Sequence, residues 1–254
     1  MTRFPIAAGL IAAFTLCTAH AQDENPLTRD EVAQVKKKLV AMLDAIGKPP
    51  AGYTVEHENF DLPTEAYKTQ ASGRYYPVSA GANREYGTRK KAEKAGEDVQ
   101  KEYQKKMLEA QAKGDYQEMT KLAQEMQKKV SAQQLEAVEG QKEPIAVAVR
   151  CNGNPGATID PDAVVFERTG VIALKYADAG SGDRTRVAIY CDPVSLKNTK
   201  QLSRVDMKMP EQGITKRNAV LNVTIEFTGP ADAVEAWAKA VDTGKVLAQI
   251  DAAR

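Results

Sequence analysis

Residues 219–241 read AVLNVTIEFTGPADAVEAWAKAV, and this stretch decides the fold class. Apolar and polar residues alternate from Leu221 to Phe227, which is the pattern of a strand with one buried and one wet face. After Pro230, apolar residues recur with a helical period from Val234 to Val241. A strand with one buried and one solvent-exposed face that leads into an amphipathic helix is typical of an antiparallel sheet covered by helices.

Further strands are predicted upstream of this stretch. The dipeptide Thr169-Gly170 separates two apolar runs and indicates a tight hairpin turn. Similar alternation predicts the upstream strands 145–151, 163–168, 171–176, 186–192 and 204–209, in addition to the strand 219–227 of the opening stretch. The sequence therefore predicts an α+β fold in which an antiparallel sheet packs against amphipathic helices.

One covering helix is expected at 28–46 and the other at 230–241. Thr28 and Glu31 form the capping box S/T-x-x-E, and an apolar stripe follows at spacings of three and four. Gly47 ends this helix, and the prolines that follow prevent its restart. Residues 51–82 are rich in Pro, Gly and Tyr, so we expect mostly loop there, with extended pieces near Tyr53–Val55 and Arg74–Val78.

A long charged segment separates the two parts of the chain. From about residue 84 to 139, Lys, Glu, Gln and Ala dominate, and basic and acidic residues nearly balance. Gly114 suits the end of a helix and Asp115 the cap of the next. The segment thus predicts two antiparallel, coiled-coil-like helices at 88–112 and 116–138, inserted as a hairpin that either projects from the body or packs along one face of it.

The N-terminal residues have the layout of a secretory signal peptide. Arg3 is the only charged residue of the first 22, an apolar run of about 13 residues follows, and Ala19-His20-Ala21 offers a small-x-small cleavage site. This run is shorter than the roughly 20 residues of a membrane-spanning helix. We expect cleavage near Ala21 and a periplasmic or secreted product without a membrane span.

The predicted divisions are a signal peptide at 1–21, a helix and extended segment at 22–83, the hairpin at 84–143 and the sheet with its last helix at 144–254.

Two cysteines remain after the predicted cleavage. In an oxidising compartment, Cys151 and Cys191 predict one disulfide, whereas a redox or metal-binding thiol pair lacks the C-x-x-C spacing. Each cysteine ends a predicted strand on its apolar face. A simple meander would separate these strand ends, so we expect one connection, residues 152–161, to cross the sheet without reversing the chain.

The composition and the absence of known motifs narrow the classes of binding and catalytic site that the chain can contain. With 35 basic and 34 acidic residues, the chain lacks the basic excess of a nucleic-acid-binding domain. Only His57 remains as a histidine after residue 21, and we interpret it as a solvated surface residue. Zinc spacings, nucleophile elbows and phosphate-binding glycine loops are absent from the sequence, so we expect neither a metal nor a cofactor.

Two surfaces are candidates for binding. A tyrosine-rich segment contains Arg74, Tyr75 and Tyr76, and aromatic residues beside arginine resemble interface anchors or sugar-stacking platforms. The same tyrosines could instead pin a long loop onto the sheet. Methionines on the helical hairpin form the second candidate, because methionine-rich helices can be adaptable binding faces; packing between the helices is the alternative. These methionines are Met107, Met119 and Met126.

The stretch from Ile46 to Tyr53, Ile-Gly-Lys-Pro-Pro-Ala-Gly-Tyr, follows an amphipathic helix. It resembles a segment of uncharacterised proteobacterial periplasmic proteins in which Pro-Pro-Ala-Gly precedes an aromatic residue. The closing order of strand, acidic helix and short apolar tail is similar to that group as well. The resemblance implies a small α+β domain and no particular activity, and the charged hairpin departs from it.

These observations favour a non-enzymatic binding or interaction protein of the cell envelope. Its partner would be another envelope protein, or a second copy of the chain held through the hairpin. The alternative is a hydrolase that uses carboxylates on an envelope polymer, since the geometry of a carboxylate pair cannot be read from spacing.

Overall fold

The computed structural model describes residues 25–69, 72–139, 142–177, 184–207 and 209–251. The predicted signal peptide at 1–21 lies outside these residues.

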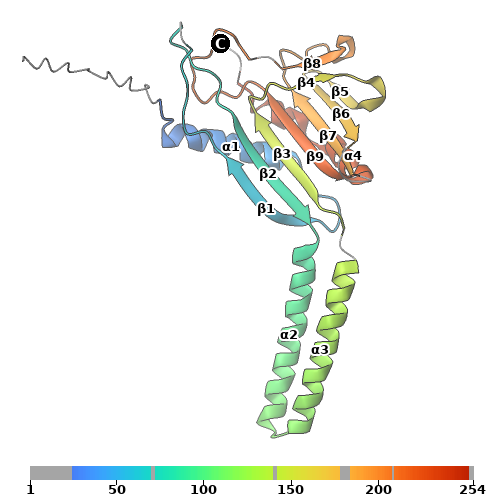
Figure 1. The fold of residues 1–254 in the computed structure, drawn as a ribbon. Helices are drawn as coiled ribbons and strands as arrows, with labels where there is room; N and C mark the ends of the chain where they lie inside the picture. The colour runs from blue at the N-terminus through green and yellow to red at the C-terminus, as the bar shows by residue number, and fades with distance from the viewer. Residues whose placement is uncertain (1–24, 70–71, 140–141, 178–183, 208, 252–254) are drawn as a thin grey trace, which may run out of the picture.

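The fold is mixed α+β, as predicted, with a seven-stranded antiparallel sheet in the order β1-β2-β3-β9-β7-β6-β5 and a two-stranded sheet of β4 and β8 (Figure 1). The strands are β1 Thr54–Asp61, β2 Ala80–Gly87, β3 Ile145–Cys151, β4 Gly156–Thr158, β5 Val164–Arg168, β6 Val171–Ala177, β7 Arg184–Cys191, β8 Arg204–Asp206 and β9 Val223–Pro230. The helices are α1 Arg29–Ala45, α2 Arg89–Ala112, α3 Tyr116–Glu139, α4 Ala231–Ala240 and α5 Thr243–Leu247.

Helix α1 begins where its capping box predicts. The Thr28 side chain accepts a hydrogen bond from the Glu31 N–H, and the Glu31 carboxylate accepts one from the Thr28 N–H, so two exposed donors of the first turn are satisfied. Gly47 follows the helix with a φ of 80°, a conformation that favours glycine.

The main core lies between one face of the large sheet and helices α1, α4 and α5. Trp237 of α4 packs edge-on against Tyr86 and Phe227, with ring centroids 4.8 and 5.3 Å away, and its indole N–H donates to the Ile46 carbonyl at 3.0 Å. This contact joins α4, two strands and the end of α1. The prediction that the helices at 28–46 and 230–241 cover the sheet is confirmed.

The predicted disulfide between Cys151 and Cys191 is wrong, because β9 lies between the two strands that carry them. Both cysteines are free and buried. Each is directly opposite Val223, one on either side, so two strand spacings of about 4.8 Å separate their backbones. A disulfide requires Cα atoms within about 7 Å.

The crossing connection after Cys151 is present. Strands β3 and β7 each pair antiparallel with β9, and β5 to β7 form a meander, so β3 and β5 run in the same direction. The connection between β3 and β5, which contains the predicted residues 152–161, therefore crosses the sheet without reversing the chain. The expectation of two adjacent cysteines failed because the last strand fills the gap that this crossing leaves.

The other face of the large sheet is covered over only part of its width. The β4–β8 ribbon and nearby loops bury a second cluster over β6 and β7, which includes Ile172, Leu174 and Met207. On β1, β2 and β3, side chains of the same face such as Asn59, Asn83 and Ala146 remain exposed. The half of the sheet formed by β1, β2 and β3 therefore exposes this face to solvent, and we call it the wet half of the sheet.

Helices α2 and α3 connect β2 to β3 and stand clear of the sheet (Figure 1). They meet along a small cluster of their own, formed by Tyr103, Ala110 and Leu122. Between them, Gly114 has a φ of 70° and Asp115 accepts a hydrogen bond from the Glu118 N–H. Within the described part of the chain, no helix is long and apolar enough to cross a membrane.

Candidate functional site

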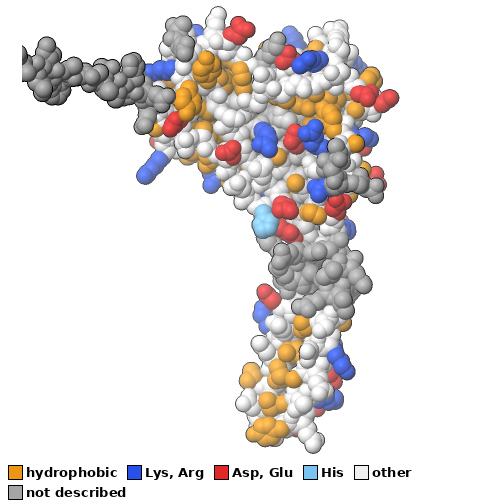
Figure 2. All heavy atoms as spheres, in the orientation of Figure 1, with side chains coloured by type: hydrophobic (Ala, Val, Ile, Leu, Met, Phe, Trp, Pro, Cys, Tyr) orange, Lys and Arg blue, Asp and Glu red, His pale blue; other side chains and the backbone are white. Residues whose placement is uncertain are grey.

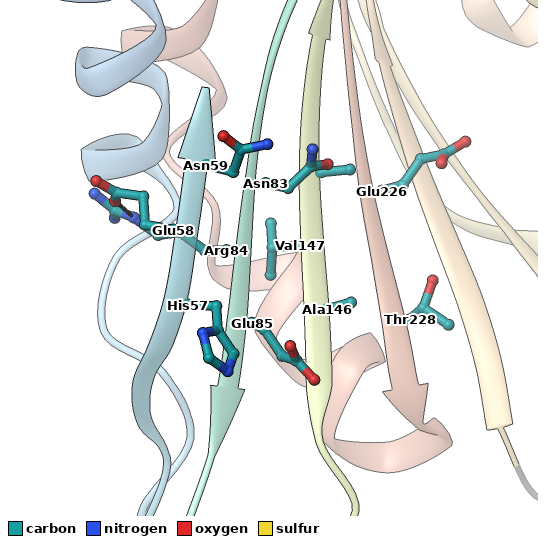
Figure 3. Close-up of a pocket in the computed structure, with 11 residues that line it drawn as sticks. His57, Glu58, Asn59, Asn83, Arg84, Glu85, Ala146, Val147, Glu226 and Thr228 are labelled. Atoms are coloured by element: carbon teal, nitrogen blue, oxygen red, sulfur yellow. Dashed lines mark hydrogen bonds and ion pairs between the residues drawn. The ribbon is translucent and has the colours of Figure 1, made fainter. Parts of the chain in front are cut away.

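The wet half of the sheet contains a groove of about 710 Å³ (Figure 3). We call it the sheet groove. This volume is within the range of small-molecule sites in proteins. The groove is lined by His57, Glu58, Asn59, Asn83, Arg84, Glu85, Ala146, Val147, Ala148, Glu226 and Thr228, from strands β1, β2, β3 and β9.

Strand register builds the groove as cross-strand rows. One row runs His57, Glu85, Ala146 and Thr228, each directly opposite the next. Because such neighbours have Cβ atoms about 5 Å apart, the imidazole and the Glu85 carboxylate lie side by side, as Figure 3 shows.

The second row runs Asn59, Asn83, Ala148 and Glu226. In both rows β3 contributes an alanine where its neighbours contribute longer polar side chains. The two alanine side chains end at Cβ, so they form a low floor, and the longer polar side chains of the neighbouring strands rise on either side of it. The groove is thus a consequence of two small residues on an otherwise polar sheet face.

A chain of polar contacts continues from one wall of the groove. The Arg186 guanidinium is 3.8 Å from the Glu226 carboxylate and stacks over the Tyr176 ring at 4.7 Å. The Tyr176 hydroxyl lies 2.9 Å from that of Tyr190, and burial raises the pKa of Tyr190 above its ordinary value. These contacts hold the Glu226 wall against the covered part of the sheet.

The lining chemistry suits binding by hydrogen bonds. Side-chain amides offer donors and acceptors, and Glu85 and Glu226 offer carboxylate acceptors. Among the described residues that line the groove there is no serine or cysteine to act as a nucleophile. In the described part of the chain, no group of three or more His, Cys, Asp or Glu side chains is arranged to hold a metal ion.

The predicted residues Arg74, Tyr75 and Tyr76 lie outside the sheet groove, in the loop between β1 and β2. Tyr75 is held on both sides, since it pairs with Lys68 and exchanges two backbone hydrogen bonds of 2.8 Å with Ile214. The Tyr76 side chain is 52% exposed. The Arg74 carbonyl accepts a hydrogen bond of 2.7 Å from the Thr69 N–H, so Arg74 and Tyr75 hold the loop through their backbones, whereas Tyr76 faces solvent.

The predicted methionines lie along the contact between α2 and α3. Met107, Met119 and Met126 are partly buried against the cluster of Tyr103, Ala110 and Leu122. Among the side chains of this helix pair that the structure describes, the exposed large apolar ones are instead Leu108 and Tyr116, at 65% and 78%. The structure thus places the methionines in helix packing, which is the alternative stated above.

The groove was missed because two of its four strands, β1 and β2, were missed, whereas β3 and β9 were predicted as the strands 145–151 and 219–227. Residues 51–82 were expected to be mostly loop, and β1 has polar residues on both faces, so period-2 alternation is hidden. The sequence offered one usable signal, the small residues Ala146 and Ala148 on the wet face of a strand whose other face is bulky.

Comparisons with known proteins give no relative: no family model, no curated protein and no solved structure matches the chain. The groove and the helix pair are therefore the features from which a function can be argued.

Proposed function

We propose that this chain is an exported, non-enzymatic interaction protein of the cell envelope, and that α2 and α3 are an inserted hairpin that contacts its partner. The signal-like segment at 1–21 supports export, and the resemblance of residues 46–53 to periplasmic proteins supports the same compartment. The partner is another envelope protein.

The observation that carries this proposal is the separation of the apolar cluster between α2 and α3 from the main core of the body. The core of the body is formed by the sheet with α1, α4 and α5, whereas Tyr103, Ala110 and Leu122 form a cluster within the helix pair. Two helices of 24 residues each extend about 36 Å. A unit of this length with a separate cluster supports a role in reaching a partner.

The exposed apolar residues of the hairpin mark the surface to test. Leu108 and Tyr116 lie on the hairpin among charged side chains, and Figure 2 shows apolar atoms at the end of the hairpin that is far from the sheet. A few residues supply most of the energy of an interface, and tyrosine is enriched among them. We therefore expect the partner to cover these two residues.

The test is site-specific photo-crosslinking in intact cells. A photoreactive amino acid at Leu108 or Tyr116 is expected to give one discrete adduct, identified by mass spectrometry. The matched control is Val194, which is 73% exposed on the body and is expected to give no adduct. Equal adducts from Val194, or none from either hairpin position, would contradict the proposal.

Self-association through the hairpin is a distinct outcome of the same experiment. An adduct of twice the chain mass would identify a second copy as the partner, and light scattering would then give a dimer. A monomer in solution together with an adduct to a different protein would support the proposal that the partner is another envelope protein.

Export has its own test. The chain isolated from a periplasmic fraction is expected to begin at Gln22, because cleavage is proposed after Ala21. N-terminal sequencing and cell fractionation measure both points. Retention of residues 1–21, or a cytoplasmic location, would contradict the proposed compartment.

A carboxylate-dependent hydrolase is the second candidate, and one observation favours it. Glu85 and Glu226 line the same groove, and His57 lies beside Glu85. Glycoside hydrolysis needs two carboxyl groups separated by about 5–9.5 Å. Release of reducing ends from purified peptidoglycan, abolished by either Glu85→Gln or Glu226→Gln, would support this candidate. No release by the unaltered protein would exclude it for this polymer.

A further inference from the structure

Two tyrosines lie side by side on an exposed face of the loop between β1 and β2. Tyr67 and Tyr76 are 67% and 52% exposed. The Tyr76 N–H donates to the Tyr67 carbonyl at 2.8 Å, and Lys68 forms a bridge with Tyr75. In such an antiparallel ladder, Tyr67 and Tyr76 are direct cross-strand neighbours whose side chains share a face, with Cβ atoms about 5 Å apart.

These tyrosines line a small hollow of about 230 Å³. Pro63 and Pro77 add apolar surface, while Thr64 and Ser79 add hydroxyl groups. Glu65 also lines the hollow and accepts a hydrogen bond from the Tyr67 hydroxyl at 2.8 Å, which raises the pKa of Tyr67. The hollow therefore combines flat aromatic faces with hydroxyl and carboxylate groups.

The loop that carries the pair is held in place from both sides. On one side, Leu27 and Ala66 donate backbone hydrogen bonds of 2.9 Å to Thr64 and Asn25. On the other, Tyr75 pairs with Ile214. The Glu65 hydrogen bond also fixes the orientation of the Tyr67 ring. A ligand that stacks here pays little of the ordering cost that usually weakens binding to loops.

We propose that Tyr67 and Tyr76 form a stacking subsite for one pyranose ring of a polysaccharide. The apolar C–H face of a sugar ring packs on an aromatic face, whose electron density is negative. The hydroxyl groups at the ring edge then reach Glu65, Thr64 and Ser79. A carboxylate has lone pairs for more than one donor, so Glu65 can hold Tyr67 and accept a sugar hydroxyl together.

Glu65 also favours a sugar over a proline-rich peptide, the other ligand that stacks on exposed tyrosines. A polyproline segment offers carbonyl acceptors and few N–H donors, and a carboxylate cannot donate to them. Sugar hydroxyl groups donate. This site is separate from the helical hairpin, so it does not depend on the partner proposed above.

The test is calorimetric titration of the full chain without residues 1–21. The probes are the β-1,4-linked tetramers of N-acetylglucosamine and of glucose, and a decaproline peptide. We expect heat from at least one sugar, and a loss of affinity of about tenfold or more for both Tyr67→Ala and Tyr76→Ala. Tyr76→Phe is expected to stay within about twofold, because stacking needs the ring and not its hydroxyl.

The control is Lys68→Ala, which alters the residue beside Tyr67 on the opposite face of the ladder and is expected to leave affinity unchanged. A melting temperature equal to that of the unaltered chain shows that each variant is folded. Three outcomes would overturn the proposal: no heat from either sugar, equal affinity in both alanine variants, or binding of decaproline alone. None of them bears on crosslinking at Leu108.

Discussion

Val223 separates two thiols at the centre of the sheet. Burial raises the pKa of both Cys151 and Cys191 to about 12, so the reactive thiolate is scarce at neutral pH. For the chain from residue 22, we expect two free thiols that react with Ellman's reagent only after unfolding in guanidinium. A reducing agent should not change the melting temperature. Rapid reaction of either thiol in the folded protein would contradict this arrangement.

Asp251 holds the end of the chain against α1. Burial raises the pKa of its carboxyl group, but hydrogen bonds from Lys38, the Val220 N–H and Lys216 outweigh this, and the pKa lies below its ordinary value of 3.8. A lowered folded-state pKa stabilises the protein above the unfolded-state pKa, and this stabilisation is lost as the pH falls through the folded-state value.

Asp251→Asn should therefore lower the free energy of unfolding at pH 7 by about 1–2 kcal/mol. It should also make the loss of stability below about pH 4 less steep. Urea unfolding at pH 7, 5 and 3 measures both effects. Glu102→Gln, which removes an exposed carboxylate on α2, serves as the control. An equal loss at pH 7 and pH 3 would refute the role given to this carboxylate.

At the scale of elements, two turns with the same backbone conformation should respond differently to a methyl group. Gly170, between β5 and β6, has a φ of 75°, and an added Cβ would lie 2.9 Å from the Pro193 Cα. Gly114, between α2 and α3, has a φ of 70° with nothing within 4 Å of that position.

Both alanine variants therefore carry the left-handed penalty of about 1 kcal/mol, and Gly170→Ala carries a further clash of about 1–3 kcal/mol. Thermal unfolding monitored by circular dichroism should rank the unaltered chain, then Gly114→Ala, then Gly170→Ala. Equal melting temperatures for the two variants would show that the Pro193 segment moves away without cost.

Elements with strong periodicity were predictable from the sequence, and those without it were not. The capping box at Thr28 and the turn at Gly114 fixed helix ends to within a residue or two of α1, α2 and α3. Strand β2 contains Gly81, Asn83 and Gly87, and has neither the β-branched residues nor the clean alternation that identify a strand.

For the whole molecule, the separation of the α2–α3 cluster from the main core predicts that these two helices can be removed without loss of the body fold. Replacing residues 89–141 by a short Gly-Ser linker should keep the melting temperature within a few degrees, because the main core stays intact and loop-closure entropy depends weakly on length. Calorimetry and circular dichroism measure this, with less helical signal expected. A chain that unfolds at room temperature would show that the helices stabilise the sheet.

The sheet groove shows why a site is harder to predict than a fold. His57, Glu85, Ala146 and Thr228 are neighbours only because of strand order. That order depends on where β9 pairs, and local sequence does not encode it. The cysteine prediction failed for the same reason: residues in phase on two strands need not belong to adjacent strands.

The position of β9 also has a consequence for biosynthesis. Strand β9, the last strand in the described part of the chain, is the fourth of seven across the sheet. Until residue 230 has been synthesised, β1 to β3 and β5 to β7 can form only two half-sheets, each with one unpaired edge where β9 belongs. A nascent chain arrested before Val223 should therefore stay open and protease-sensitive, and the sheet can close only after residue 230 has been synthesised.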